Sequence, residues 1–180
     1  MRGIRQLGFD VNYYKGLSWD EIQSLVDKIC AEIIISDIDI SCIVGLSRGG
    51  LIPAVMIANQ LDIREVYSYG LKSYNDENSP ESIKTYQYFH PEYLHGREIL
   101  IVDDISDRGE SLGYIKSKYE SNPRDKLNIH TCTLTIKEHT DFIPTWFGST
   151  TPNHCWVMFP WETDGIKRIN KNENSNIRNK

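Results

Sequence analysis

The sequence predicts an α/β fold, in which a doubly wound, mostly parallel sheet is covered by helices. Short apolar segments typical of buried strands alternate with longer segments of helical periodicity. Polar loops separate these segments at the spacing of strand–helix–strand units. Hydrophobic residues make up 39% and charged residues 25% of the 180 residues. This composition is ordinary for one globular domain with a full hydrophobic core.

The first half of the chain alternates two predicted helices with two predicted strands. Residues 17–35 open with an S-x-x-E capping box and continue with apolar residues at helical spacing. Residues 41–46 form a short apolar strand. A helix follows over residues 51–61, with Pro53 in its first turn, where the missing N–H costs little. Residues 65–71 are the next predicted strand.

The second half continues the alternation after a long polar stretch, residues 72–88. A loop of this length inside a compact domain is typical of a functional lid. Residues 99–105 are a predicted strand, and residues 111–121 are a helix that the dipeptide Asn-Pro ends. Residues 127–137 alternate as a strand does, and residues 153–162 hold a dense group of aromatic side chains.

Composition excludes several classes of protein. The N-terminal residues lack an apolar core, and no apolar run is long enough to span a bilayer, so we expect a cytoplasmic protein. The net charge of −5 argues against a broad nucleic-acid footprint. Four cysteines are widely scattered without a C-x-x-C pair, which predicts reduced, buried thiols: Cys30, Cys42, Cys132 and Cys155.

The segment E-I-L-I-V-D-D-I-S-D-R-G-E-S-L, residues 98–112, is the most informative one. A buried strand runs directly into three carboxylates, a glycine and a serine, and then into a helix. A helix N-terminus attracts anions, whereas carboxylates repel them. The ligand that suits both is anionic at one end and rich in hydroxyls at the other. The alternative is an ordinary turn, in which Asp107 or Ser111 caps the helix.

Hydroxyl groups would satisfy Asp103 and Asp104, because an adjacent pair of carboxylates at a strand end needs hydrogen-bond donors. Two more loops leave predicted strands in the same direction, at residues 47–50 and from Lys72 onward. In open α/β sheets, ligands bind beyond the carboxyl ends of the strands. We therefore expect these three loops to converge on one site.

The segment V-D-D-I-S-D-R-G-E-S, residues 102–111, resembles the phosphoribosyl-pyrophosphate (PRPP) loop of type I phosphoribosyltransferases. The resemblance implies that Asp103 and Asp104 hold the ribose hydroxyls. It also implies that five residues bind the 5′-phosphate: Asp107, Arg108, Gly109, Glu110 and Ser111. Two positions depart from the family pattern, because Arg108 replaces a threonine and Glu110 replaces a small or neutral residue.

The segment G-L-S-R-G-G-L-I-P-A, residues 45–54, looks like the pyrophosphate loop of the purine branch, especially the xanthine-guanine enzymes. Ser47, Arg48 and Gly49 would then bind pyrophosphate. A cis, non-proline peptide is expected between Ser47 and Arg48 or next to it. Without the resemblance, this segment would be a helix-entry turn. The tripeptide Lys72-Ser73-Tyr74 is similar to the start of the hood loop that closes over the reacting centre in hypoxanthine-guanine enzymes.

The segment W-V-M-F-P-W-E, residues 156–162, resembles the base-binding segment of the same branch. Trp156 would stack on a purine, and the backbone at Val157 would face its C2 side. Lys137 would donate a hydrogen bond to the oxygen on C6. Glu162 lies where these enzymes place an aspartate that helps hold Mg²⁺-pyrophosphate, so we assign a metal role to Glu162 and Asp104. The alternative is a core strand with aromatic side chains.

The resemblance implies a Mg²⁺-dependent purine phosphoribosyltransferase of the salvage type. It would join guanine, xanthine or hypoxanthine to PRPP and release pyrophosphate and a purine nucleoside monophosphate, with Asp107 handling the proton at purine N7. We expect one domain over residues 1–169, a hood from the N-terminal and 138–169 segments, a mobile loop at about 72–88, and a disordered tail over 170–180. The family habitually forms dimers or tetramers.

Two alternatives remain at this point. Some regulators keep the same fold and PRPP loop but sense PRPP or a nucleotide without catalysis. Such a sensor usually carries an added DNA-binding domain or a basic face, which this composition does not offer. The other alternative is a transferase for a different base, such as orotate or uracil, and Lys137 with Trp156 favours 6-oxopurines by resemblance.

Overall fold

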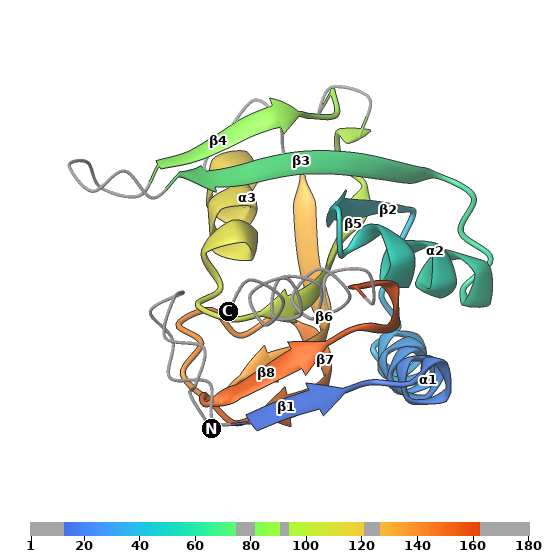
Figure 1. Cartoon of the computed structure of the whole chain (residues 1–180). Helices are drawn as coiled ribbons and strands as arrows, with labels where there is room; N and C mark the ends of the chain where they lie inside the picture. Colours follow the sequence, from blue (N-terminus) through green and yellow to red (C-terminus); the bar gives the residue numbers. More distant parts are fainter. Residues whose placement is uncertain (1–12, 75–81, 91–93, 121–126, 163–180) are drawn as a thin grey trace, which may run out of the picture. The chain divides into compact units, whose positions relative to one another are not determined.

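The computed structural model divides the chain into two compact units, and each is described by itself. The sheet unit comprises residues 24–151, and the terminal unit comprises residues 1–23 and 152–180. Helix α1 (Trp19–Ile35) begins in one unit and ends in the other. The structure describes residues 13–74, 82–90, 94–120 and 127–162 (Figure 1).

The sheet unit contains six described strands in the order β4-β3-β2-β5-β6-β7. Neighbouring strands are parallel throughout, except for the antiparallel pair β3–β4. This topology confirms the predicted doubly wound, mostly parallel sheet. The strands are β2 (Cys42–Ser47), β3 (Val66–Tyr74), β4 (Ser82–Gln87), β5 (Glu98–Ser106), β6 (Asn128–Lys137) and β7 (Trp146–Thr151).

Helices α2 (Leu51–Gln60) and α3 (Glu110–Glu120) cover opposite faces of this sheet (Figure 1). Successive residues of a strand point to opposite faces. On β2, a Cβ added at Gly45 would lie 3.0 Å from the Cβ of Ala54 on α2. The next side chain back, Val44, belongs to the core cluster that contains Leu112 and Ile115 of α3.

The centre of the sheet is buried on both faces. Ile99, Leu100, Ile101 and Val102 of β5 are all fully buried. A continuous apolar run is what a parallel strand covered on both sides requires. Each such side chain contributes about 1.5–3 kcal/mol through removal of apolar surface from water. This run leads directly to Asp103 and Asp104, which lie in the last part of β5, before the strand ends at Ser106.

The polar stretch expected to be a loop over residues 72–88 is strand at both ends. Strand β3 continues to Tyr74, and β4 pairs with it from Ser82 to Gln87. The β-branched and aromatic residues in I-K-T-Y-Q-Y, residues 83–88, are a strand signal that the sequence analysis overlooked. Residues 75–81 lie outside the described residues, so mobility of this segment stays a prediction.

The terminal unit pairs β1 (Tyr13–Gly16) with β8 (Cys155–Met158) in parallel, and a short 3₁₀ helix, η2 (Pro160–Glu162), follows. The predicted capping box at the start of α1 is present. The backbone N–H of Glu21 donates to Ser18 Oγ over 3.2 Å, and the N–H of Ser18 donates to Glu21 Oε2 over 2.8 Å. The predicted disordered tail lies outside the described residues.

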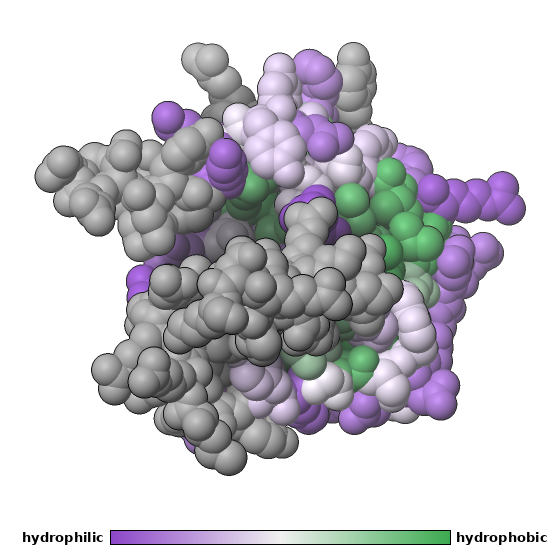
Figure 2. Space-filling model, viewed as in Figure 1, coloured by the Kyte–Doolittle hydropathy of each residue, from purple (hydrophilic) through white to green (hydrophobic). Residues whose placement is uncertain are grey.

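All four cysteines are buried and unbridged, as predicted. Burial raises the pKa of the Cys30 and Cys42 thiols to about 11. No helix in the described part of the chain is long and apolar enough to cross a membrane. Figure 2 shows apolar side chains gathered over α2, where Val55 is 51% exposed.

Candidate active site

Three loops of the sheet unit leave the carboxyl ends of adjacent parallel strands. Strand β5 pairs with β2 on one side and with β6 on the other. The loops after β2, β5 and β6 therefore meet at one edge of the sheet. This edge is where open α/β sheets bind ligands.

The loop after β2 packs directly on the acidic pair at the end of β5. A Cβ added at Gly49 would overlap the side-chain carboxylate of Asp104. A Cβ added at Gly50 would lie 2.8 Å from the Cα of Asp103. The two glycines therefore permit a close approach of the predicted pyrophosphate loop to the predicted ribose carboxylates, Asp103 and Asp104. The peptide bond between Ser47 and Arg48 is cis, at the expected position.

The first member of the acidic pair, Asp103, lies where a charged carboxylate is poorly solvated. Burial raises the pKa of Asp103 well above its usual range, and the neighbouring Asp104 carboxylate raises it further. The backbone N–H of Asp104 donates to Asp103 Oδ1 over 3.0 Å. Hydroxyl donors or a cation at this place would offset the charge. Within the described ranges, no group of three or more His, Cys, Asp or Glu side chains forms a metal centre by itself.

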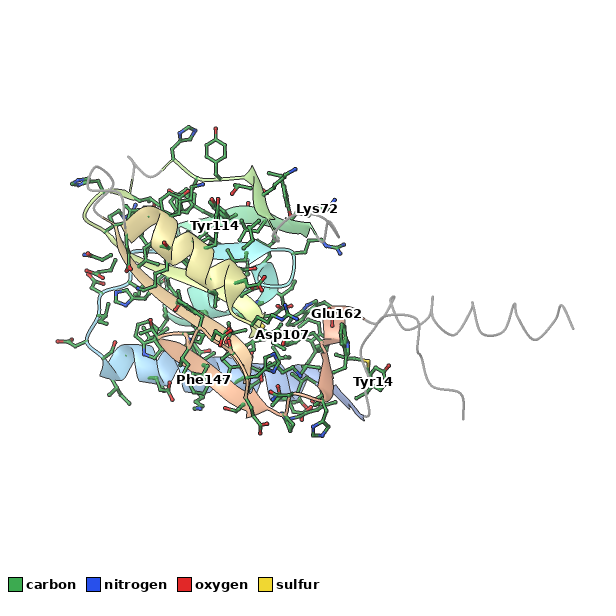
Figure 3. All side chains as sticks on the ribbon, turned by 90° about the vertical axis from the view of Figure 1, so that its left-hand side faces the viewer. Tyr14, Lys72, Asp107, Tyr114, Phe147 and Glu162 are labelled. Carbon is green, nitrogen blue, oxygen red and sulfur yellow. The ribbon has the colours of Figure 1, made fainter. Side chains whose placement is uncertain are left out.

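The start of helix α3 lies beside the same loop. The carbonyl of Gly109 accepts the first helical hydrogen bond, from the N–H of Gly113 over 2.9 Å, so Gly109 occupies the N-cap position. Neither Asp107 nor Ser111 holds that position, contrary to the alternative considered from the sequence. The first N–H groups of a helix have no acceptor within it, and they attract anions. Figure 3 shows Asp107 at this end of α3.

The two residues that depart from the expected phosphate loop compensate each other. Arg108 Nη1 lies 3.9 Å from Glu110 Oε1. Both side chains are exposed, so the ion pair adds little stability. It does place a positive charge beside Glu110, which offsets the repulsion that this carboxylate would exert on a phosphate.

Residues 138–142, which we call the docking loop, form part of the site, although the sequence analysis did not assign them to it. His139 Nε2 lies 3.0 Å from Asp107 Oδ1. The N–H of Asp141 donates to the carbonyl of Arg108 over 3.3 Å. No motif in K-E-H-T-D, residues 137–141, marks this contact, because a short polar loop carries no spacing that predicts its partner.

Tyr86 is a second residue that the sequence analysis missed. Its hydroxyl lies 2.8 Å from Ser47 Oγ in the loop after β2. The β3–β4 register shifts between Gly70 and Leu71, so Tyr86 is the extra residue of a β-bulge. A Cβ at Gly70 would overlap the Tyr86 ring. Bulges of this kind redirect a side chain, here toward the predicted pyrophosphate loop.

The remaining sheet-unit residues lie at strand ends. Lys137 is the last residue of β6 and only 6% exposed. Lys72, Ser73 and Tyr74 end β3 instead of beginning a loop, and Lys72 is exposed (Figure 3). The side chains of Ser73 and Tyr74 lie outside the described part. A buried lysine at the binding edge fits the predicted purine contact, which stays a prediction.

The other predicted residues belong to the terminal unit. Trp156 is 50% exposed, whereas Val157 and Phe159 are buried. The exposed surface of the Trp156 indole leaves room for a stacked ring. The buried side chains of Val157 and Phe159 instead fit the alternative of a core strand. Glu162 Oε2 accepts a hydrogen bond from the backbone N–H of Phe159 over 3.1 Å. The proposed roles of Trp156, Val157 and Glu162 stay predictions.

The fold and these loops define a phosphoribosyltransferase of the type I fold. The family model described as the phosphoribosyl transferase domain matches residues 18–161, and the chain therefore belongs to this family of pentosyltransferases. The xanthine-guanine phosphoribosyltransferase of Cereibacter sphaeroides is 34% identical over 123 residues, which are 67% of this chain and 68% of that protein. The predicted family and its purine branch are confirmed.

Solved structures of other proteins share the fold. One is the xanthine-guanine-hypoxanthine phosphoribosyltransferase of Helicobacter pylori, with a TM-score of 0.71 and 21% identity, covering 88% of this chain and 99% of that one. The other is a hypothetical protein from Neisseria gonorrhoeae with bound ppGpp, with a TM-score of 0.73 and 21% identity, covering 88% and 94%. At these identities, the likeness concerns the fold alone.

Proposed function

We propose that the protein transfers the phosphoribosyl group of PRPP to a 6-oxopurine, namely guanine, xanthine or hypoxanthine, in purine salvage. The observation that carries this proposal is the packing of Gly49 against Asp104. It joins the predicted pyrophosphate loop to the predicted ribose carboxylates, beside the helix start that would take the 5′-phosphate. The name of the Cereibacter sphaeroides relative supports the choice of purine.

The reaction exchanges two bonds at C1′ of the ribose. The lone pair of purine N9 forms the new bond, and the C1′–O bond breaks with its electron pair leaving on pyrophosphate. The proton on purine N7 passes to the carboxylate of Asp107. Positive charge develops on the ribose ring as the bond breaks, so the carboxylates nearby would stabilise the transition state more than the ground state.

Each part of the ligand has a matching group. Asp103 and Asp104 would accept hydrogen bonds from the ribose hydroxyls. The start of α3, with Arg108 and Ser111, would hold the 5′-phosphate. For the base, we propose that Lys137 of the sheet unit donates to the oxygen on C6. The roles assigned to Trp156 in stacking and to Val157 at the C2 side belong to the terminal unit and stay predictions.

The acidic pair also fits Mg²⁺, because this hard cation takes oxygen ligands and would favour the charged form of the buried Asp103. In the sheet unit, we propose that Asp104 holds the cation, with pyrophosphate and ribose oxygens as further ligands. The metal role assigned to Glu162, in the terminal unit, stays a prediction. When bound, the cation would neutralise charge on the departing pyrophosphate.

A nucleotide-sensing regulator with the same fold is the alternative function. The Neisseria gonorrhoeae structure shows that a protein of this fold holds ppGpp. A sensor would bind PRPP or a nucleotide without turning it over. Self-association as a dimer or tetramer and a cytoplasmic location also stay predictions; light scattering of the purified chain measures the first.

The test of the proposal is the formation of purine nucleoside monophosphate from PRPP and a 6-oxopurine with Mg²⁺, in the wild type and in Asp107→Asn. We expect the substitution to lower kcat by roughly 100-fold or more, which is the usual contribution of a general acid–base group. PRPP binding, followed by calorimetry, should persist. A wild type that binds PRPP and forms no nucleotide would contradict the proposal and favour the sensor. An unchanged kcat in Asp107→Asn would remove this residue from the mechanism.

A further inference from the structure

We propose that His139 is a positioning residue, which holds one oxygen of the Asp107 carboxylate so that the other oxygen can take the purine proton. This inference rests on the proposed function. His139 Nε2 lies 3.0 Å from Asp107 Oδ1. An ionised carboxylate only accepts hydrogen bonds, so Nε2 carries the proton in this contact.

The contact is unsuited to a role in stability. The side chains of His139 and Asp107 are 38% and 64% exposed. Exposed pairs of this kind add about 0–1 kcal/mol to folding. A carboxylate on a surface loop rotates freely unless a partner fixes it. Orientation of Asp107 is therefore the effect that this hydrogen bond can supply.

The docking loop brings His139 to Asp107 on a fixed backbone. On one side, the N–H of Thr140 donates to the carbonyl of Lys137 over 3.1 Å, which closes a turn directly after β6. On the other side, Ser106 Oγ lies 2.9 Å from Thr140 Oγ1 and donates to the carbonyl of Phe142 over 3.1 Å. The backbone on either side of His139 is thus held, and less backbone entropy remains to be lost when the imidazole binds Asp107.

The same loop links two parts of the proposed reaction. Lys137, the proposed contact to the oxygen on C6, lies two residues before His139. The docking loop would therefore set the distance between the group that recognises the base and the group that takes its proton. A misplacement of about 1 Å in such a geometry can cost roughly 100-fold in rate.

The distinguishing experiment is a double-mutant cycle on kcat. We expect His139→Ala to lower kcat about tenfold while changing the KM for PRPP by less than about twofold, because the imidazole acts on a proton transfer and touches no phosphate. His139→Gln retains an N–H donor at similar reach and should recover most of the loss. In the Asp107→Asn background, His139→Ala should have no further effect.

Glu138→Ala is the matched control, because it truncates an exposed side chain of the docking loop and leaves the backbone hydrogen bonds of the loop and the His139 side chain in place. An equal loss of kcat in Glu138→Ala and His139→Ala would assign the effect to the loop as a whole and overturn the inference. So would an additive effect of His139→Ala in the Asp107→Asn background, or an unchanged kcat in His139→Ala.

Failure of the proposed function gives a different result from failure of this inference. An inactive wild type would contradict the function, and the pair would then be examined by the ¹⁵N resonance of the His139 side chain. We expect that resonance to move in Asp107→Asn and to stay in place in Glu138→Ala. A resonance that does not move in Asp107→Asn would overturn the pairing itself.

Discussion

Gly109→Ala tests how tightly the phosphate loop is packed against the docking loop. Gly109 has a φ of +82°, and a Cβ there would overlap the Cβ of Phe142 and approach its backbone N to 3.0 Å. The left-handed backbone costs a non-glycine residue about 1–2 kcal/mol. Forcing an extra methyl group into a packed site costs about 1–3 kcal/mol more. We expect a total loss of about 3 kcal/mol in the free energy of unfolding, or about 6–12 °C in Tm for a chain of this size.

Gly96→Ala is the matched control for this substitution. Gly96 has a similar φ of +73°, but a Cβ there would have no heavy atom within 4 Å. It should therefore lose only the backbone cost, about 1–2 kcal/mol. Calorimetric unfolding of both variants measures the difference, and the KM for PRPP should rise about tenfold in Gly109→Ala alone, since the phosphate loop must move. Equal Tm losses in the two variants would refute the packing argument.

Three further predictions address single residues. Asp103→Asn should stabilise the ligand-free protein at pH 7 and have no such effect near pH 3. Burial raises the pKa of Asp103 in the folded state, so this carboxyl lowers stability only at pH values above its pKa in the unfolded chain. Measurement of Tm at both pH values checks this, and a gain of equal size at pH 3 would contradict it. Lys137→Ala should weaken binding of the purine base by about tenfold or more, which is the usual contribution of a hydrogen bond from a charged group, and should leave PRPP binding nearly unchanged. Equal losses of affinity for the base and for PRPP in a calorimetric titration would show that Lys137 has a structural role. Tyr86→Phe should raise the KM for PRPP a few-fold, because the Tyr86 hydroxyl contacts Ser47. Tyr88→Phe, on the same exposed segment, is the control and should leave this KM unchanged. Identical steady-state constants in the two variants would exclude a role of Tyr86 in PRPP binding.

The sheet could be predicted because its signals are local. Four consecutive buried residues before Asp103 mark a parallel strand, and the capping box before α1 marks a helix start. Strand β4 was missed because it is a short strand at the edge of the sheet without a continuous apolar run. Its β-branched and aromatic residues were outweighed by the loop-like composition of residues 72–82.

The site was predictable only as far as its motifs extend along the chain. The close approach of Gly49 to Asp104 follows from a glycine-containing loop after β2 and an acidic pair near the end of the adjacent strand β5. The contact between His139 and Asp107 joins residues from different loops. Asp107 lies in a recognisable motif, but no neighbour of His139 indicates that the two residues meet. Such contacts depend on how the docking loop folds after β6, which no periodicity in the sequence specifies.

The central claim is that this chain transfers phosphoribosyl from PRPP to a 6-oxopurine. The most direct measurement is the release of pyrophosphate from PRPP with Mg²⁺, with guanine, xanthine, hypoxanthine, adenine, uracil and orotate supplied separately. We predict turnover with at least one of guanine, xanthine and hypoxanthine and none with uracil or orotate. Silence with every base, together with measurable binding of PRPP or a nucleotide, would contradict the claim and identify a sensor.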